Sequence, residues 1–398
     1  MYPELVFSDE ESKKIEELRR RLKNEVSSEI YEDKTMFHRF LKARNFNINH
    51  AEAMLRKNLK WRKENQMDTF LKDYKANEVM EKYFPLSFVG YDKEGCVVRY
   101  LEVGTVDVKG LYLSAKYTDL ERRLLHDIEC DIALLKDQTR KLGRRVDKCV
   151  YIHNYEGLTF AQVSNRKIIE DVMSFCRTYQ DNYPERLKAV IGINASKYFQ
   201  WGFSIVKTCL AGTVIEKVKV FGADGWQEEL LKCIDAEQLP AFLGGKKTDP
   251  DGNPDCKTFI NHGGIVPERY YINKRRRSLA FITSAKKTVL SRKSSHEETI
   301  LVEEPGSFIE WEFETKIHDI GFGIFRQENI SGENKMVEIV PIHRINTKEF
   351  AETGLYRCEE SGKYVIVFDN TYSWMRSKEL FFRITVIRPN DERNVANI

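Results

Sequence analysis

KYFQWGFSIVKTCL, residues 197–210, is a stretch in which apolar and aromatic side chains fill more than half of the positions. On a helix that turns by about 100° per residue, these side chains form two adjacent stripes. One stripe holds Phe199, Phe203, Val206 and Leu210, and the other holds Tyr198, Trp201, Ile205 and Cys209. An apolar arc of this width is typical of a helix buried between two packed layers. It also fits a helix that covers an apolar cavity with one face and meets a membrane with the other.

Strands are predicted on both sides of this helix. Short β-rich runs occur at Leu86–Tyr91, Cys96–Val103, Cys149–His153, Leu187–Ile193 and Val218–Phe221. Helical stretches over residues 117–142, 160–183 and 199–210 alternate with these runs. Strands that alternate with long helices indicate a sheet with parallel pairs and helical cover. We therefore expect an α/β domain over residues 76–247.

The parts on either side of this α/β domain are expected to fold differently. Residues 1–75 are predicted to form a helical bundle, in which Ser8 and Glu11 have the spacing of a capping box and Asn49 caps a third helix. Residues 248–275 form a connector that begins with a segment rich in Pro, Gly and Asp. Over residues 276–390, short β-rich runs separated by Gly and Asn turns indicate a β-sandwich; the runs are 278–283, 308–315, 321–326, 336–342, 364–368 and 381–387. The predicted fold class is thus multidomain, α/β plus all-β.

Composition limits the classes of function. The chain has 398 residues, of which 41% are hydrophobic, and its net charge is only +3. So small a net charge gives weak attraction to polyanions, and no nucleic-acid partner is expected. No apolar run is long enough to span a bilayer and no secretory signal is evident, so we expect a cytoplasmic protein with at most peripheral membrane association. The eight cysteines are scattered and are expected to be reduced.

Motifs for catalysis and cofactor binding are absent from the sequence. There is no Gly-rich phosphate loop, no GxSxG and no HExxH, so no catalytic residue, cofactor or metal is expected. His153 and Glu156 have the residue types of an acid–base pair, but no nucleophile or metal site accompanies them, which favours a simple exit from a strand. Acidic residues alternate over 249–255 as in a calcium loop. However, Pro254 and Ile260 stand where an EF-hand needs Gly and Glu, so a turn is expected.

An ordered series of motifs resembles the CRAL-TRIO lipid-transfer family, and within it the longer, squalene- and tocopherol-binding members that add a C-terminal GOLD domain. The motifs are FLKARNF at 40–46, NYPER at 182–186, Leu239-Pro240 with Gly244-Gly245, the connector 248–255 followed by INHGG at 260–264, and in the β region DIGFGIF at 319–325 and VFDNTYS at 367–373. The resemblance implies an N-terminal helical region, a CRAL-TRIO α/β lipid-binding domain and a C-terminal GOLD β-sandwich.

The resemblance also implies a ligand and a site. It implies a hydrophobic ligand, such as phosphatidylinositol, tocopherol or squalene, held in a cavity behind the helix at 198–210. That helix then acts as a gate formed by Tyr198, Phe199, Trp201, Phe203, Ile205, Val206, Cys209 and Leu210. Glu185 and Lys217 match the positions that hold an inositol phosphate headgroup in relatives, although a structural ion pair between them is an alternative. Arg99 stands where relatives carry an aromatic residue, and an anionic headgroup or Glu102 could be its partner.

The GOLD-like module implies partners beyond the lipid. Trafficking proteins and transient membrane contact are expected, and the basic run 274–277 is interpreted as a solvated connector, with membrane contact and a nuclear signal as alternatives. Two functions follow from the same fold: a lipid carrier, or a lipid-regulated trafficking adaptor without net transfer. An enzyme on the α/β scaffold is the third hypothesis, and it lacks a nucleophile or metal site.

Overall fold

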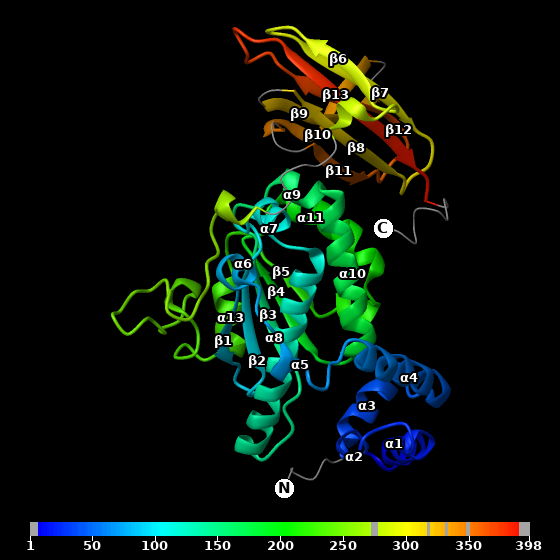
Figure 1. Cartoon of the computed structure of the whole chain (residues 1–398), viewed down its shortest axis with the longest axis vertical. Helices are drawn as coiled ribbons and strands as arrows, with labels where there is room; N and C mark the ends of the chain where they lie inside the picture. The colour runs from blue at the N-terminus through cyan, green and yellow to red at the C-terminus, as the bar shows by residue number, and fades with distance from the viewer. Residues whose placement is uncertain (1–6, 272–277, 317–318, 331–332, 348–350, 390–398) are drawn as a thin grey trace. The chain divides into compact units, whose positions relative to one another are not determined.

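The computed structural model of the chain describes residues 7–271, 278–316, 319–330, 333–347 and 351–389 (Figure 1). It divides into two compact units, and each unit is made of three segments that are not consecutive in the sequence. The first unit holds Met1–Gly157, Ser174–Ser196 and Cys209–Ile272. The second holds Leu158–Met173, Lys197–Thr208 and Asn273–Ile398. The basic run 274–277 lies outside the described residues.

The helices and strands before residue 158 belong to the first unit. They are α1 (Asp9–Leu22), α2 (Ser28–Glu32), α3 (Lys34–Lys42), α4 (Ile48–Glu64), α5 (Phe70–Asp73), α6 (Glu78–Tyr83), β1 (Leu86–Tyr91), β2 (Val97–Glu102), α7 (Val108–Ser114), α8 (Tyr117–Leu142) and β3 (Cys149–Asn154). The chain continues with α9 (Phe160–Ser164), α10 (Arg166–Asn182), β4 (Leu187–Ile193), α11 (Lys197–Val206), a 3-10 turn at Lys207–Cys209, α12 (Gly212–Ile215), β5 (Val218–Val220) and α13 (Trp226–Cys233). Short 3-10 turns follow at Ala241–Leu243 and Glu268–Tyr270.

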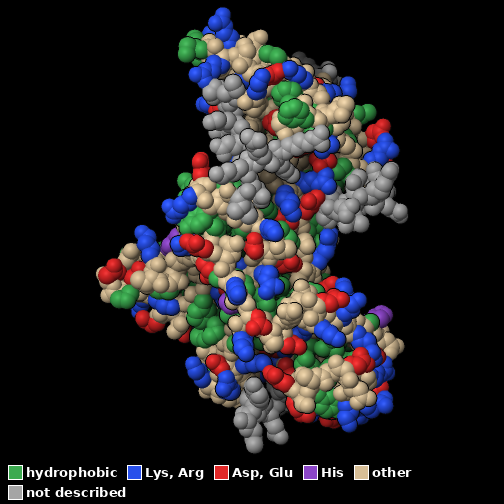
Figure 2. Space-filling view, in the orientation of Figure 1, with side chains coloured by type: hydrophobic (Ala, Val, Ile, Leu, Met, Phe, Trp, Pro, Cys, Tyr) green, Lys and Arg blue, Asp and Glu red, His purple; other side chains and the backbone are tan. Residues whose placement is uncertain are grey.

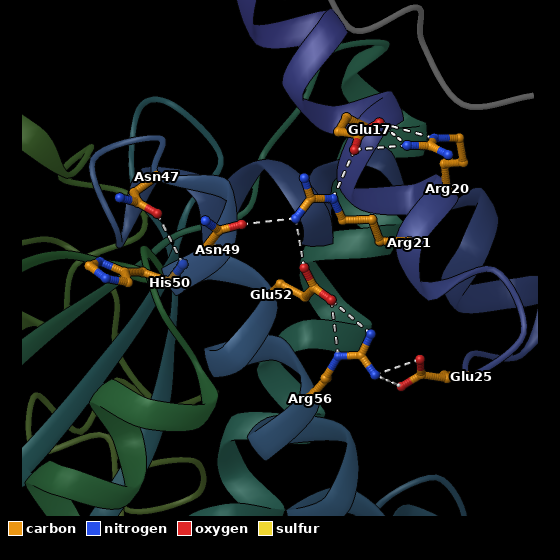
Figure 3. A network of polar contacts seen from close by, with 9 residues as sticks. All are labelled: Glu17, Arg20, Arg21, Glu25, Asn47, Asn49, His50, Glu52 and Arg56. Atoms are coloured by element: carbon orange, nitrogen blue, oxygen red, sulfur yellow. Dashed lines mark hydrogen bonds and ion pairs between the residues drawn. The ribbon is translucent and has the colours of Figure 1, made fainter.

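The N-terminal helices begin where polar side chains satisfy their free amides. The capping box before α1 is confirmed, because Glu11 N donates to Ser8 Oγ (3.2 Å) and Ser8 N donates to Glu11 Oε2 (3.0 Å). The predicted cap at Asn49 is wrong: Asn47 precedes α4, and its side chain accepts from His50 N (3.1 Å). Asn49 instead accepts from Arg21, within the network of ion pairs and hydrogen bonds that joins α1 to α4 (Figure 3).

The sheet of the first unit has the order β1-β2-β3-β4-β5. β1 is antiparallel to β2, and the remaining neighbours are parallel, as predicted from the alternation of strands and helices. Because successive side chains point to opposite faces, Val98 and Ile152 pack with Leu230 of α13 on one face. Arg99 points to the other face, where it meets α8.

The long helix predicted over 160–183 is divided in two. α9 ends at Ser164, Asn165 adopts an extended conformation, and α10 begins at Arg166. The Asn165 side chain accepts from Ile168 N (3.2 Å), so it acts as a cap for the second helix. Asn favours caps over helix interiors because its side chain competes for backbone amides.

The second unit contains the predicted β-sandwich, so the expected fold class is confirmed. Its elements are a 3-10 turn (Leu279–Phe281), β6 (Lys286–Leu290), β7 (Ser295–Val302), β8 (Phe308–Thr315), β9 (Asp319–Ile330), β10 (Glu333–Asn346), β11 (Glu352–Arg357), β12 (Gly362–Asp369) and β13 (Lys378–Ile387). They form two antiparallel sheets, β10-β9-β12-β7 and β11-β8-β13-β6. Trp311, Phe322 and Phe368 are among the buried rings of the core between them. Gly354 of β11 is opposite Trp311, and a Cβ there would lie 2.0 Å from the indole, so only Gly fits.

Sequence patterns missed three strands of this sandwich. The run at 278–283 is a 3-10 turn rather than a strand, and β6, β7 and β11 were not predicted. All three are edge strands. Edge strands carry polar side chains that discourage pairing with other chains, which weakens the apolar signal on which strand prediction depends. In β7, for example, only Val302 is buried.

On the face shown in Figure 2, the Lys, Arg, Asp and Glu side chains of the described residues are intermixed, and no large region carries charges of one sign. Within the described ranges, no helix is long and apolar enough to cross a membrane. The same residues contain no group of three or more His, Cys, Asp and Glu that could hold a metal ion.

Candidate functional site

Glu185 and Lys217 are close together in the first unit. Lys217 Nζ lies 3.9 Å from Glu185 Oε2, and the two side chains are 23% and 17% exposed. Glu185 lies just before β4 and Lys217 just before β5, and parallel strands bring their amino ends to the same edge of the sheet. Glu185 has a left-handed backbone (φ +59°), a conformation that residues other than Gly rarely adopt and that often marks functional positions.

Two further lysines surround Glu185, and the sequence did not identify them. Lys42 Nζ at the end of α3 lies 3.5 Å from Glu185 Oε2, the same oxygen that Lys217 approaches. Lys148, just before β3, is near enough to lower the pKa of Lys217. Burial is the largest cause of that lowered pKa; Glu185 opposes it, and the charges of Lys148 and Lys42 add to it. Three ammonium groups near the carboxylates of Glu185 and Glu216 leave a net positive charge, which favours an anionic group beside them.

The face of the sheet that meets α8 carries polar aromatic side chains with uncovered surface. Tyr151 and His153 of β3, Tyr155 beyond it and Tyr179 of α10 each retain accessible surface. Burial nevertheless dominates the pKa of each: it raises the pKa of the three tyrosines and lowers the pKa of His153 to about 4. Each of these four side chains is therefore largely surrounded by protein and keeps some accessible surface. All four belong to the first unit.

His153 and Glu156 do not form an acid–base pair. His153 Nδ1 is 3.3 Å from the Tyr155 hydroxyl, and burial keeps the imidazole neutral at physiological pH. Glu156 is exposed, and its backbone amide donates to Asn154 Oδ1 (3.1 Å) as the chain leaves β3. This arrangement is the strand exit that the sequence favoured.

Arg99 does not pair with Glu102, one of the two partners considered for it. Its Nε donates to Asp131 Oδ1 (2.9 Å) and its Nη1 to Asp127 Oδ1 (3.2 Å), both on α8, and its side chain is buried. Glu102 instead pairs with His262. Arg99 therefore fixes α8 to β2, and two carboxylates explain why the chain tolerates a buried guanidinium.

The predicted gate residues lie on α11 and the turn after it. α11 ends at Val206 rather than at Leu210, and Lys207–Cys209 continue as a 3-10 turn. Phe199 and Phe203 of the first stripe stack with ring centroids 5.3 Å apart. Of the second stripe, Tyr198 and Trp201 pack against the sandwich core within the second unit, where Trp201 meets Tyr356 edge to face (6.3 Å). Ile205 is buried, whereas Val206, Cys209 and Leu210 are half-buried.

The acidic loop at 249–255 forms turns, as expected. Asp251 Oδ1 accepts from Asn253 N (2.9 Å), and Asn253 Oδ1 accepts from Asp255 N (3.0 Å). Asp249 is buried and accepts from Thr258 N (3.1 Å). These bonds direct the side-chain oxygens to backbone amides rather than to a common centre.

A separate cavity of about 460 Å³ lies at the carboxyl ends of β2, β3 and β4. Asn194 donates to Asn154 (2.9 Å), and Asn154 donates to the Tyr100 hydroxyl (3.2 Å) along its wall. None of the predicted site residues lines this cavity. Its polar wall differs from the apolar lining that a lipid chain requires.

Comparisons with known proteins find two matching families. The family model described as CRAL/TRIO domain matches residues 81–245, and the one described as Golgi-dynamics membrane-trafficking matches residues 326–386. The chain is 28% identical to Protein real-time of Aedes aegypti over 300 residues, covering 73% of this chain and 45% of that protein. It is 25% identical to Protein ctg-1 of Caenorhabditis elegans over 351 residues, covering 87% and 90%. The chain therefore spans less than half of the mosquito protein but most of the nematode one.

A solved structure shares the fold. The crystal structure of Sfh5 has a TM-score of 0.50 and 18% sequence identity, covering 67% of this chain and 97% of Sfh5. At that identity the match supports the fold of the chain.

Proposed function

Because this chain belongs to the CRAL/TRIO family of lipid-binding and lipid-transfer proteins and carries a C-terminal GOLD-type domain, we propose that it carries a hydrophobic ligand between membranes. The observation that carries the proposal is the lysine cluster around Glu185, which places cationic groups at one edge of the sheet. The face of the same sheet that meets α8 keeps accessible surface. One end of the site suits a phosphate, and the other suits an apolar body.

The ligand that fits this arrangement best is phosphatidylinositol. Lys217, Lys42 and Lys148 supply cationic donors for the phosphate, while the Glu185 carboxylate accepts from inositol hydroxyls. Acyl chains contribute about 0.8 kcal/mol for each methylene removed from water, so a modest length of chain gives strong binding. Tocopherol or squalene would use the apolar region without the lysine cluster.

The gate is part of the same proposal. Phe199 and Phe203 supply a stacked apolar surface on α11, and we assign to it the covering of the bound lipid. Displacement of this helix at a membrane would let the ligand pass between two apolar phases without crossing water. Transient membrane contact and GOLD-type recruitment of trafficking proteins complete the proposal, with the domain boundaries at residues 75, 247 and 275.

Transfer between vesicles tests the proposal. Donor vesicles carrying fluorescent phosphatidylinositol are mixed with acceptor vesicles, and the rate of transfer is measured with and without the full chain. We expect the chain to accelerate transfer. Binding of the lipid without acceleration would overturn the carrier function and favour a lipid-regulated adaptor.

A further inference from the structure

Two cysteine thiols meet beside the end of the gate helix. Cys176 lies on α10, and Cys209 ends the 3-10 turn that follows α11. The two thiols are within hydrogen-bonding reach of each other. Both side chains are half-buried, and both residues belong to the first unit.

The backbone around the pair is held in place by one side chain. Gln180 Nε2 donates to the Cys176 carbonyl (3.2 Å) and to the Cys209 carbonyl (3.1 Å). Gln180 Oε1 accepts from Ala211 N (2.8 Å). One amide thus joins the backbone of Cys176 to that of Cys209 and keeps the two residues next to each other.

Cys209 differs chemically from the other cysteines. The hydrogen bond from Cys176 lowers the pKa of Cys209, and the charge of Arg177 contributes in the same direction. The other seven cysteines have a raised pKa, through burial in six and chiefly through the same hydrogen bond in Cys176. Oxidation selects thiols with thiolate character that have a second cysteine nearby.

We propose that Cys176 and Cys209 form a reversible disulfide in response to peroxide, and that this bond fixes the end of the gate helix to α10. The Cys209 thiolate attacks hydrogen peroxide, so an S–O bond forms, the O–O bond breaks and, with one proton, water leaves. The Cys176 sulfur then attacks the sulfenic sulfur, so the S–S bond forms, the S–O bond breaks and a second water leaves. Two thiols are oxidised and one peroxide is reduced to two waters.

The effect of this disulfide on lipid exchange rests on the proposed function of α11 as a gate. A covalent bond between α10 and the turn after α11 holds the C-terminal end of α11 in one position. Any opening that needs this end to move is then prevented until a dithiol reduces the bond. Lipid release is therefore expected to become sensitive to peroxide.

The test uses the full chain treated with hydrogen peroxide, alkylated with N-ethylmaleimide and mapped by peptide mass spectrometry. We expect two of the eight thiols to be lost, a cross-linked peptide pair containing Cys176 and Cys209, and full recovery with dithiothreitol. In Cys176→Ser the reaction should stop at sulfenic acid on Cys209, which dimedone traps. Cys233→Ser, a half-buried cysteine on α13, is the matched control and should still form the disulfide.

Transfer of fluorescent lipid, measured on the same samples, tests the consequence. We expect oxidation to slow transfer by at least about fivefold in the wild type, the lower end of typical coupling between sites. Oxidation should leave the rate of Cys176→Ser unchanged relative to its own reduced form. Absence of the Cys176–Cys209 peptide pair, or a disulfide that leaves transfer unaffected, would overturn the inference. A reduced protein that transfers no lipid would refute the proposed function instead, while the peptide map would still decide whether the disulfide forms.

Discussion

Replacing Lys217 by Ala removes one cation from the proposed headgroup site and leaves its neighbours in place. The Lys217 ammonium lies 3.9 Å from Glu185 and its side chain is 23% exposed, so solvent partly screens it. A hydrogen bond to a charged group contributes about 1.5–3 kcal/mol, and partial exposure favours the lower end of that range. A loss of about 1.5 kcal/mol corresponds to a roughly tenfold weaker Kd for phosphatidylinositol.

The assay is a titration of the full chain with fluorescent phosphatidylinositol, with α-tocopherol as the second ligand. Lys219→Ala is the matched control, because Lys219 lies two residues later on β5, is 55% exposed and pairs with Glu229 (2.6 Å). We expect Lys217→Ala to weaken phosphatidylinositol and spare tocopherol, and Lys219→Ala to change neither. Equal losses for both ligands, or for both variants, would refute the assignment, as would an unchanged Kd in Lys217→Ala.

Three other changes test the remaining parts of the account. Phe203→Asp places a carboxylate in the apolar stripe of α11 and should reduce lipid loading while thermal unfolding stays cooperative; unchanged loading would remove the gate assignment. Arg99→Ala leaves Asp131 buried without its cation and should lower the free energy of unfolding in urea by about 3–5 kcal/mol, whereas a change below about 1 kcal/mol would show that Arg99 does not fix α8. His262 has a raised pKa, chiefly through its hydrogen bond to Glu102, so its stabilising contribution is present below about pH 6.5 and is lost as pH rises through the folded-state pKa. His262→Gln should therefore destabilise the chain more at about pH 6 than at about pH 9, and an equal effect at both values would contradict the pairing.

Strands with mostly buried side chains were predictable because burial requires apolar residues, which the sequence shows directly. β1 and β4 match the predicted bounds, and α8 does as well, since each is long enough for its apolar pattern to be unambiguous. The edge strands β6, β7 and β11 were missed because their polar side chains do not alternate clearly with apolar ones. Asn47 was overlooked as a cap because Asn49, two residues later, has the same side chain.

The candidate site was predictable only in part, because its residues are distant in the chain. Glu185 and Lys217 came from motif resemblance, and the structure places them together. Lys42 and Lys148 carried no motif of their own, although Lys148 precedes a strand of the same parallel sheet, and that position was the available signal. The partners of Arg99 could not be read from the sequence, because they lie 28 and 32 residues away on a helix whose rotation depends on packing.

Native mass spectrometry of the full chain, purified from cells without detergent, tests lipid carriage most directly. We expect a bound species with the mass of a hydrophobic lipid at close to one copy per chain, exchangeable for phosphatidylinositol supplied in vesicles. A chain that is lipid-free on purification and takes up neither phosphatidylinositol nor tocopherol from vesicles would contradict it.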